Sequence, residues 1–167
     1  MIEGKYKSIQ GETIIELEDK KYHLVEAGHH HEGNKDHEGN CFEEFGHYRV
    51  FNSGMLEFTD EREIIEGKEV EADKDWATYQ VGLIVDNYII DEVDKLNIKD
   101  GKYIIKDINE KLTLKENKAF KKVSLFTKTE EGTYEINGET IVVKFKNENR
   151  KYIFRDDKMY RVYFEKC

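Results

Sequence analysis

The chain has 167 residues with a formal net charge of −9, and 38% of its residues are apolar while another 38% are charged. Its 10 tyrosines and 9 phenylalanines are enough to fill a core, which excludes a disordered chain. The 27 basic residues are interspersed among 36 acidic ones, a mixture typical of a solvated surface. Because a general nucleic-acid binder needs a concentrated basic patch, we expect no nucleic-acid partner.

Apolar runs and cysteines indicate the compartment. No apolar run follows Met1, and no stretch of 18 apolar residues occurs, so we expect neither a signal peptide nor a membrane span. Cys41 and Cys167 are too few and too far apart for a disulfide framework and are interpreted as free thiols. We therefore expect a cytoplasmic protein, or an exported one if a signal peptide has been removed from its N-terminus.

Short apolar segments with turn residues between them predict strands throughout the first 58 residues. The expected strands are 4–6, 13–17, 22–25, 46–50 and 55–58, the last two forming a hairpin. The charged stretch 60–75 fits either a pair of surface strands or a frayed helix. Residues 76–85 are rich in strand formers, and Asp86-Asn87 turns the chain into 88–96, which fits a strand or a short helix.

The segment 132–164 predicts four consecutive antiparallel strands. Asn137-Gly138 is typical of a two-residue hairpin turn, because both central residues of a type I′ turn need positive φ. Alternation then predicts one core-facing set on the first two strands, namely Tyr134, Ile136, Ile141, Val143 and Phe145. Further turns are expected at Asn147 to Asn149 and at Asp156-Asp157.

The early pattern returns after Gly101. Gly4-Lys5-Tyr6 matches Gly101-Lys102-Tyr103, and Gly46-His47-Tyr48 matches Gly132-Thr133-Tyr134. This similarity predicts an internal pseudo-repeat over about 1–69 and 98–167. The second copy lacks a counterpart of the His-rich insertion 27–40, which therefore becomes a candidate functional loop.

The expected fold is all-β. An antiparallel meander of 8–10 strands with an internal pseudo-repeat closes into a lipocalin-like barrel, and residues 1–167 form a single domain. Closure removes exposed sheet edges, and a barrel of this size has room for one small ligand.

Two tripeptides support this prediction. Gly4-Lys5-Tyr6 resembles the Gly-x-Trp or Gly-x-Tyr near the N-terminus of lipocalins and intracellular lipid-binding proteins, the calycin-type β-barrels. Arg161-Val162-Tyr163 resembles the Arg-x-Tyr with which intracellular lipid-binding proteins hold a carboxylate. The resemblance implies that Arg161 and Tyr163 bind the carboxylate of a fatty-acid-like ligand, and Tyr134 joins them as a candidate ligand-binding residue. Whether Arg161 faces inward depends on the Asp156-Asp157 turn, since two residues there turn it inward and three turn it outward.

The His-rich loop is the candidate metal site. His29, His30, His31 and His37 lie close to acidic residues and Cys41, a set that zinc, nickel or copper accepts. The alternative is a polar, flexible loop with no metal, since the spacing matches no closed structural site.

Catalytic motifs are absent from the sequence. We find no nucleophile elbow, phosphate loop, dinucleotide fingerprint or zincin helix, and adjacent Glu43 and Glu44 would point to opposite faces of a strand. We therefore expect no enzyme but a protein that binds a small, partly apolar, hydrophobic molecule inside its barrel. The alternatives are an acidic protein-interaction or inhibitor module with a protein partner, and metal capture by the His-rich loop.

Overall fold

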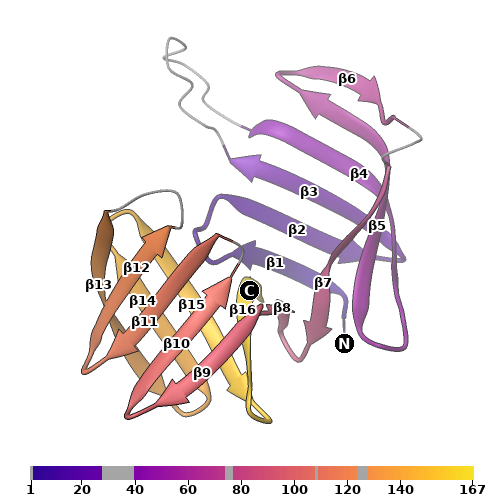
Figure 1. Ribbon diagram of the computed structural model, residues 1–167. Helices are drawn as coiled ribbons and strands as arrows, with labels where there is room; N and C mark the ends of the chain where they lie inside the picture. Colours follow the sequence, from indigo (N-terminus) through magenta and orange to yellow (C-terminus); the bar gives the residue numbers. More distant parts are fainter. Residues whose placement is uncertain (1, 28–39, 74–76, 108, 124–127) are drawn as a thin grey trace. The chain divides into compact units, whose positions relative to one another are not determined.

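A computed structural model describes residues 2–27, 40–73, 77–107, 109–123 and 128–167 (Figure 1). These residues form sixteen strands, and the registers between neighbouring strands are antiparallel. The first eight are β1 Gly4–Ser8, β2 Thr13–Glu18, β3 Lys21–Ala27, β4 Asn40–Val50, β5 Met55–Ile65, β6 Lys68–Glu71, β7 Thr78–Val85 and β8 Tyr88–Glu92. The others are β9 Lys95–Lys99, β10 Lys102–Asp107, β11 Glu110–Lys115, β12 Lys118–Val123, β13 Thr129–Asn137, β14 Thr140–Phe145, β15 Glu148–Arg155 and β16 Lys158–Lys166. The prediction of an all-β antiparallel meander is confirmed.

The chain divides into two compact units. Unit 1 comprises Met1–Ile90 and Tyr163–Cys167, and unit 2 comprises Asp91–Val162. Strand β16 therefore contributes its first half to unit 2 and its last residues to unit 1. No helix in the described ranges is long and apolar enough to cross a membrane.

Unit 1 is a closed barrel. Its strands follow the order β1-β2-β3-β4-β5-β7-β8-β16, and β16 pairs back onto β1 through Tyr6 opposite Lys166. This ring of eight strands is the predicted barrel, while β6 lies outside it and pairs with β5 alone. The interior is filled by apolar side chains that are at most 1% exposed, among them Tyr6, Ile15, Leu17, Leu56, Phe58 and Ile89.

Unit 2 is a single curled meander from β9 to the first half of β16. Alternation again selects its core, because Leu112 and Leu114 of β11 are buried while their neighbours are more exposed. They pack with Ile105, Ala119, Tyr134, Ile141, Val143, Phe145, Tyr152 and Met159. Two-residue turns at Glu116-Asn117 and Asp156-Asp157 adopt positive φ at both positions and join neighbouring strands.

The turn after β13 corrects one detail of the prediction. Asn137 pairs with Thr140, so the two loop residues are Gly138 and Glu139 and not Asn137 and Gly138. The pairing slips by two residues relative to the expected one, and a slip of two keeps every side chain on its predicted face. Tyr134 is accordingly buried on the predicted side, although Ile136 near the turn is 48% exposed.

Both ambiguous segments form strands. The stretch 60–75 contains the second half of β5 and the short strand β6, which pair around Glu66-Gly67. The helical alternative for 88–96 is wrong, because the Asp86-Asn87 turn pairs Tyr88 with Val85 and continues β7 into β8. The pseudo-repeat itself stays a prediction.

Candidate functional site

A bulge between β4 and β5 shapes the polar end of unit 1. The register shifts at Phe45 and Gly46, so that Asp60 lies opposite Gly46. A Cβ on Gly46 would lie 1.9 Å from the Thr59 carbonyl oxygen and 2.9 Å from Cε1 of Tyr22. The missing side chain allows the Tyr22 ring to stack on Phe58, with centroids 3.8 Å apart and planes 6° apart.

Glu44 is a buried carboxylate held by two tyrosines. It is 6% exposed, and its cross-strand partners are Leu24 and Glu63. The Tyr22 hydroxyl donates a hydrogen bond of 2.6 Å to Oε2 of Glu44, and the Tyr79 hydroxyl donates to the same oxygen. These two bonds fix the carboxylate and leave its other oxygen, Oε1, for a further partner.

Asp60 lies next to Glu44 and is 7% exposed. Its Oδ1 is buried and finds no hydrogen-bond partner among the residues that the structure describes. Glu44, Asp60 and Glu63 each offer one carboxylate oxygen, and these three oxygens lie within 4.8 Å of one another. We call these three residues the acidic cluster.

Burial and neighbouring charge change the titration of this site. Burial, a hydrogen bond with Glu63 and the charges of Glu44 and Glu63 together raise the pKa of Asp60 to about 8. Burial, followed by the hydrogen bond to Glu44, also raises the pKa of both Tyr22 and Tyr79 above the ordinary tyrosine value. At neutral pH Asp60 therefore holds a proton, which a bound cation would displace.

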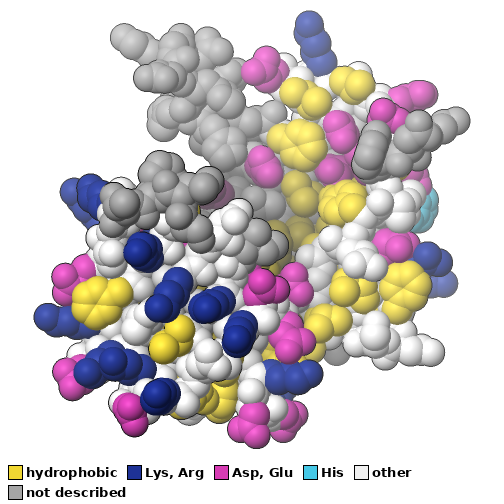
Figure 2. Space-filling model, in the orientation of Figure 1, with side chains coloured by type: hydrophobic (Ala, Val, Ile, Leu, Met, Phe, Trp, Pro, Cys, Tyr) yellow, Lys and Arg dark blue, Asp and Glu magenta, His cyan; other side chains and the backbone are white. Residues whose placement is uncertain are grey.

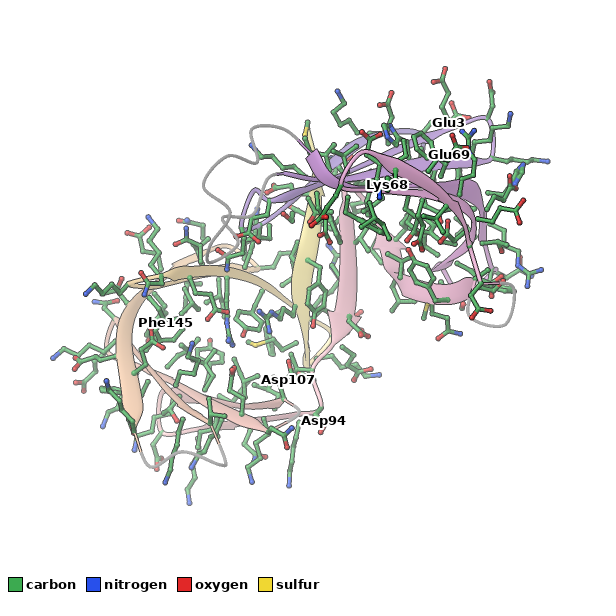
Figure 3. The ribbon with its side chains drawn as sticks, turned by 90° about the horizontal axis from the view of Figure 1, so that it is seen from above. Glu3, Lys68, Glu69, Asp94, Asp107 and Phe145 are labelled. Atoms are coloured by element: carbon green, nitrogen blue, oxygen red, sulfur yellow. The ribbon has the colours of Figure 1, made fainter. Side chains whose placement is uncertain are left out.

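A groove reaches Asp60 of the acidic cluster. It has a volume of about 750 Å³, and its lining includes Thr59, Asp60, Arg62, Glu69, Ala77 and Thr78. Arg62 donates a hydrogen bond of 3.0 Å to Glu69 on β6, where Figure 3 labels Lys68 and Glu69. Most of the lining residues are polar or charged, so the groove suits a small charged ligand better than a lipid chain.

The three predicted ligand-binding residues have different surroundings in the structure. Arg161 lies opposite Tyr152 across a two-residue turn, which is the inward alternative, and its Nη2 lies 3.3 Å from Oε1 of Glu148. Tyr134 belongs to the core of unit 2, whereas Tyr163 belongs to unit 1 and is 38% exposed. Their role toward a ligand stays a prediction.

Arg161 joins a network of charges in unit 2 that the sequence did not reveal. Arg150 is 5% exposed and donates to both carboxylate oxygens of Glu110, one of them at 2.9 Å. It also bonds Glu148, which accepts a further bond of 2.8 Å from Lys121. Burial would raise the pKa of Glu148, but the bonds from Arg150 and Lys121 outweigh burial and hold it at about 2. The buried charges of this network are therefore paired with opposite charges within unit 2.

The predicted metal residues His29, His30, His31 and His37 lie outside the described residues, so metal binding by this loop stays a prediction. Glu43 and Glu44 do point to opposite faces, since Glu43 bonds His23 at 2.8 Å while Glu44 is buried.

Asp60 is the residue that sequence reasoning missed. Leu56, Phe58 and Asp60 are every second residue of β5, and all three are buried. This alternation is the sequence pattern that indicates an inward-facing Asp60. The charge pattern alone places it in the charged stretch 60–75 instead.

Comparison of the chain with protein-family models, curated proteins and solved structures finds no significant match.

Proposed function

We propose that the chain is a non-catalytic binding protein and that the acidic cluster in unit 1 holds a small, positively charged ligand. The observation that carries the proposal is the unpartnered, buried Oδ1 of Asp60 beside two further carboxylates. Leaving such an oxygen without a partner costs about 1–3 kcal/mol, which a bound cation would recover. Close carboxylates repel one another when ionised, so a cation between them stabilises all three.

The charge of unit 1 supports a cationic ligand. Its acidic residues outnumber its basic residues by more than two to one, which raises the local concentration of cations. The available donors are oxygens, which suit an ammonium group or a hard ion such as Ca²⁺.

The barrel is the predicted scaffold, but we place the ligand elsewhere than the sequence suggested. Tyr6, Leu56 and Phe58 fill the apolar interior, whereas Asp60 of the acidic cluster lines the groove. A kinship with lipocalins remains part of the proposal, and it rests on the barrel and the Gly4-Lys5-Tyr6 tripeptide.

Calorimetric titration and thermal melting with CaCl₂, MgCl₂ and spermidine at pH 8.5 test the proposal. Saturation at 100 times the dissociation constant adds about 2.7 kcal/mol, a rise in melting temperature of about 5–10 °C. Asp60→Asn should lose this response. Asp19→Asn removes the same charge from an exposed turn of unit 1 and should keep it. An unresponsive wild type, or an Asp60→Asn variant that responds like wild type, would overturn the proposal.

A further inference from the structure

The outer face of β9–β12 in unit 2 carries rows of lysines. One row runs straight across the four strands, because Lys95 pairs with Lys106, Lys106 with Lys111, and Lys111 with Lys122. A second row lies four residues away from the first along the same strands. In it, Lys99 pairs with Lys102, and Lys115 pairs with Lys118. The inward side chains between them, such as Ile105 and Leu112, are buried, so all eight lysines share the outer face, which we call the lysine face.

This arrangement is costly without a partner. Like charges directly opposite each other on neighbouring strands destabilise a sheet. Along β9–β12, the outward positions hold no acidic side chain, as the sequence of these described strands shows. The ion pair that Lys118 makes, 3.7 Å from Glu131, lies at the border with β13. In contrast, Lys121 faces inward and is paired with Glu130 and Glu148.

A neutral row separates the two rows of lysines. It consists of Asn97, Ile104, Thr113 and Phe120, which pair with one another in register. Ile104, Thr113 and Phe120 are half-buried. The two lysine rows are four positions apart along each strand, which corresponds to roughly 13 Å at about 3.3 Å per residue. Figure 2 shows this pattern as lysine and arginine side chains gathered around a few hydrophobic ones over these strands.

We propose that the lysine face binds single-stranded nucleic acid. The two rows provide cations for a phosphate backbone, and Phe120 between them provides a surface on which a base stacks. A polyphosphate chain removes the repulsion along each row, because each phosphate neutralises a lysine. The half-buried Ile104 and Phe120 do not protrude as a membrane-inserting side chain would, which favours nucleic acid over an anionic bilayer.

The composition of the whole chain conceals this face. Acidic residues dominate unit 1, whereas basic residues outnumber acidic ones in unit 2, so the net charge of −9 averages two different surfaces. The expectation of no nucleic-acid partner followed from the interspersed basic and acidic residues of the whole chain. The lysine face is independent of the cation site proposed for unit 1.

Fluorescence anisotropy of a labelled oligothymidylate, titrated with the full chain over a range of salt concentrations, tests the inference. The slope of log affinity against log salt is about −0.7 for each phosphate contact on a single strand. The triple variant Lys106→Gln, Lys111→Gln, Lys122→Gln should therefore flatten the slope by about 2. The matched triple Lys7→Gln, Lys21→Gln, Lys68→Gln on exposed positions of unit 1 should leave the slope unchanged.

A second variant separates stacking from charge. Phe120→Leu keeps an apolar side chain in the sheet but removes the ring, and it should weaken binding about tenfold with no change in salt slope. Melting curves confirm that each variant is folded. No binding at low salt, or equal loss in both triple variants, would overturn the inference. So would binding to phosphatidylserine vesicles but not to the oligonucleotide, or low-salt self-association of the chain that the lysine-face triple abolishes while no oligonucleotide binds.

Discussion

At the scale of single residues, Asp60 shows how one position in an alternating strand changes the chemistry of a barrel. The strand β5 directs Leu56, Phe58 and Asp60 inward, and only the last is charged. The tyrosines that hold Glu44 do not reach Oδ1 of Asp60. This one oxygen is what distinguishes the acidic cluster from the closed charge network around Arg150.

The raised pKa of Asp60 predicts how stability depends on pH. The folded carboxyl has a pKa of about 8, well above the value of about 3.9 in an unfolded chain. Between these values the folded form holds a proton that the unfolded form has lost, so the free energy of unfolding falls as pH rises from 4 to 8. Asparagine has no carboxyl to ionise, so the Asp60→Asn variant should not lose stability in this way as pH rises. We expect it to be more stable than wild type by on the order of 2 kcal/mol at pH 9, with the difference shrinking toward pH 5.

Urea denaturation without added cation, repeated across this pH range, checks the expectation. The Asp19→Asn variant should follow wild type at every pH. A constant difference between Asp60→Asn and wild type would contradict the assignment of the titration to Asp60.

At the scale of elements, turns and alternation account for most of what the sequence predicted correctly. Asp86-Asn87 and Asp156-Asp157 form the expected two-residue turns, and the first of them rules out a helix over 88–96. The bulge opposite Gly46, where Glu61 is the extra residue of β5, was not predictable, because a bulge leaves no periodic signal in one strand and depends on the partner strand. Without the bulge, the proximity of Glu44 and Asp60 is invisible in the sequence.

Position 46, opposite the bulge, should not tolerate a side chain. Gly46→Ala places a Cβ against the backbone of Thr59 and the ring of Tyr22, neither of which has room to move away. We expect a loss of at least about 2 kcal/mol in the free energy of unfolding, measured by urea denaturation. His47→Ala removes an exposed neighbour and should stay within about 0.5 kcal/mol of wild type. A Gly46→Ala variant as stable as His47→Ala would show that the fold does not require glycine at position 46.

At the scale of the whole molecule, the predicted closed barrel is present, but the prediction joined both halves of the chain in it, whereas strands β9–β15 lie outside the ring. Short strands with regular turns imply a closed meander, but they do not say which strands close it. The ring uses seven strands from the first 92 residues and the end of β16. The second meander follows from the same patterns, yet its lysine face appears only when the register places lysines from four strands in rows.

Closure by β16 predicts a sensitive position at the end of the chain. Glu165 pairs with Lys7 of β1, and a proline there removes a ladder hydrogen-bond donor and distorts the strand. We expect Glu165→Pro to lower the melting temperature by about 10 °C or more, because it costs about 3 kcal/mol. Glu165→Thr keeps the strand and serves as the control. Similar melting temperatures for both variants would argue against closure by this strand.

The pairing of the first strand with the last also has a consequence for biosynthesis. During translation β1 emerges from the ribosome early, but its partner is made only after all of unit 2. The nascent chain therefore carries an unclosed sheet with a free edge at β1 until β16 has been made, the kind of surface that chaperones bind.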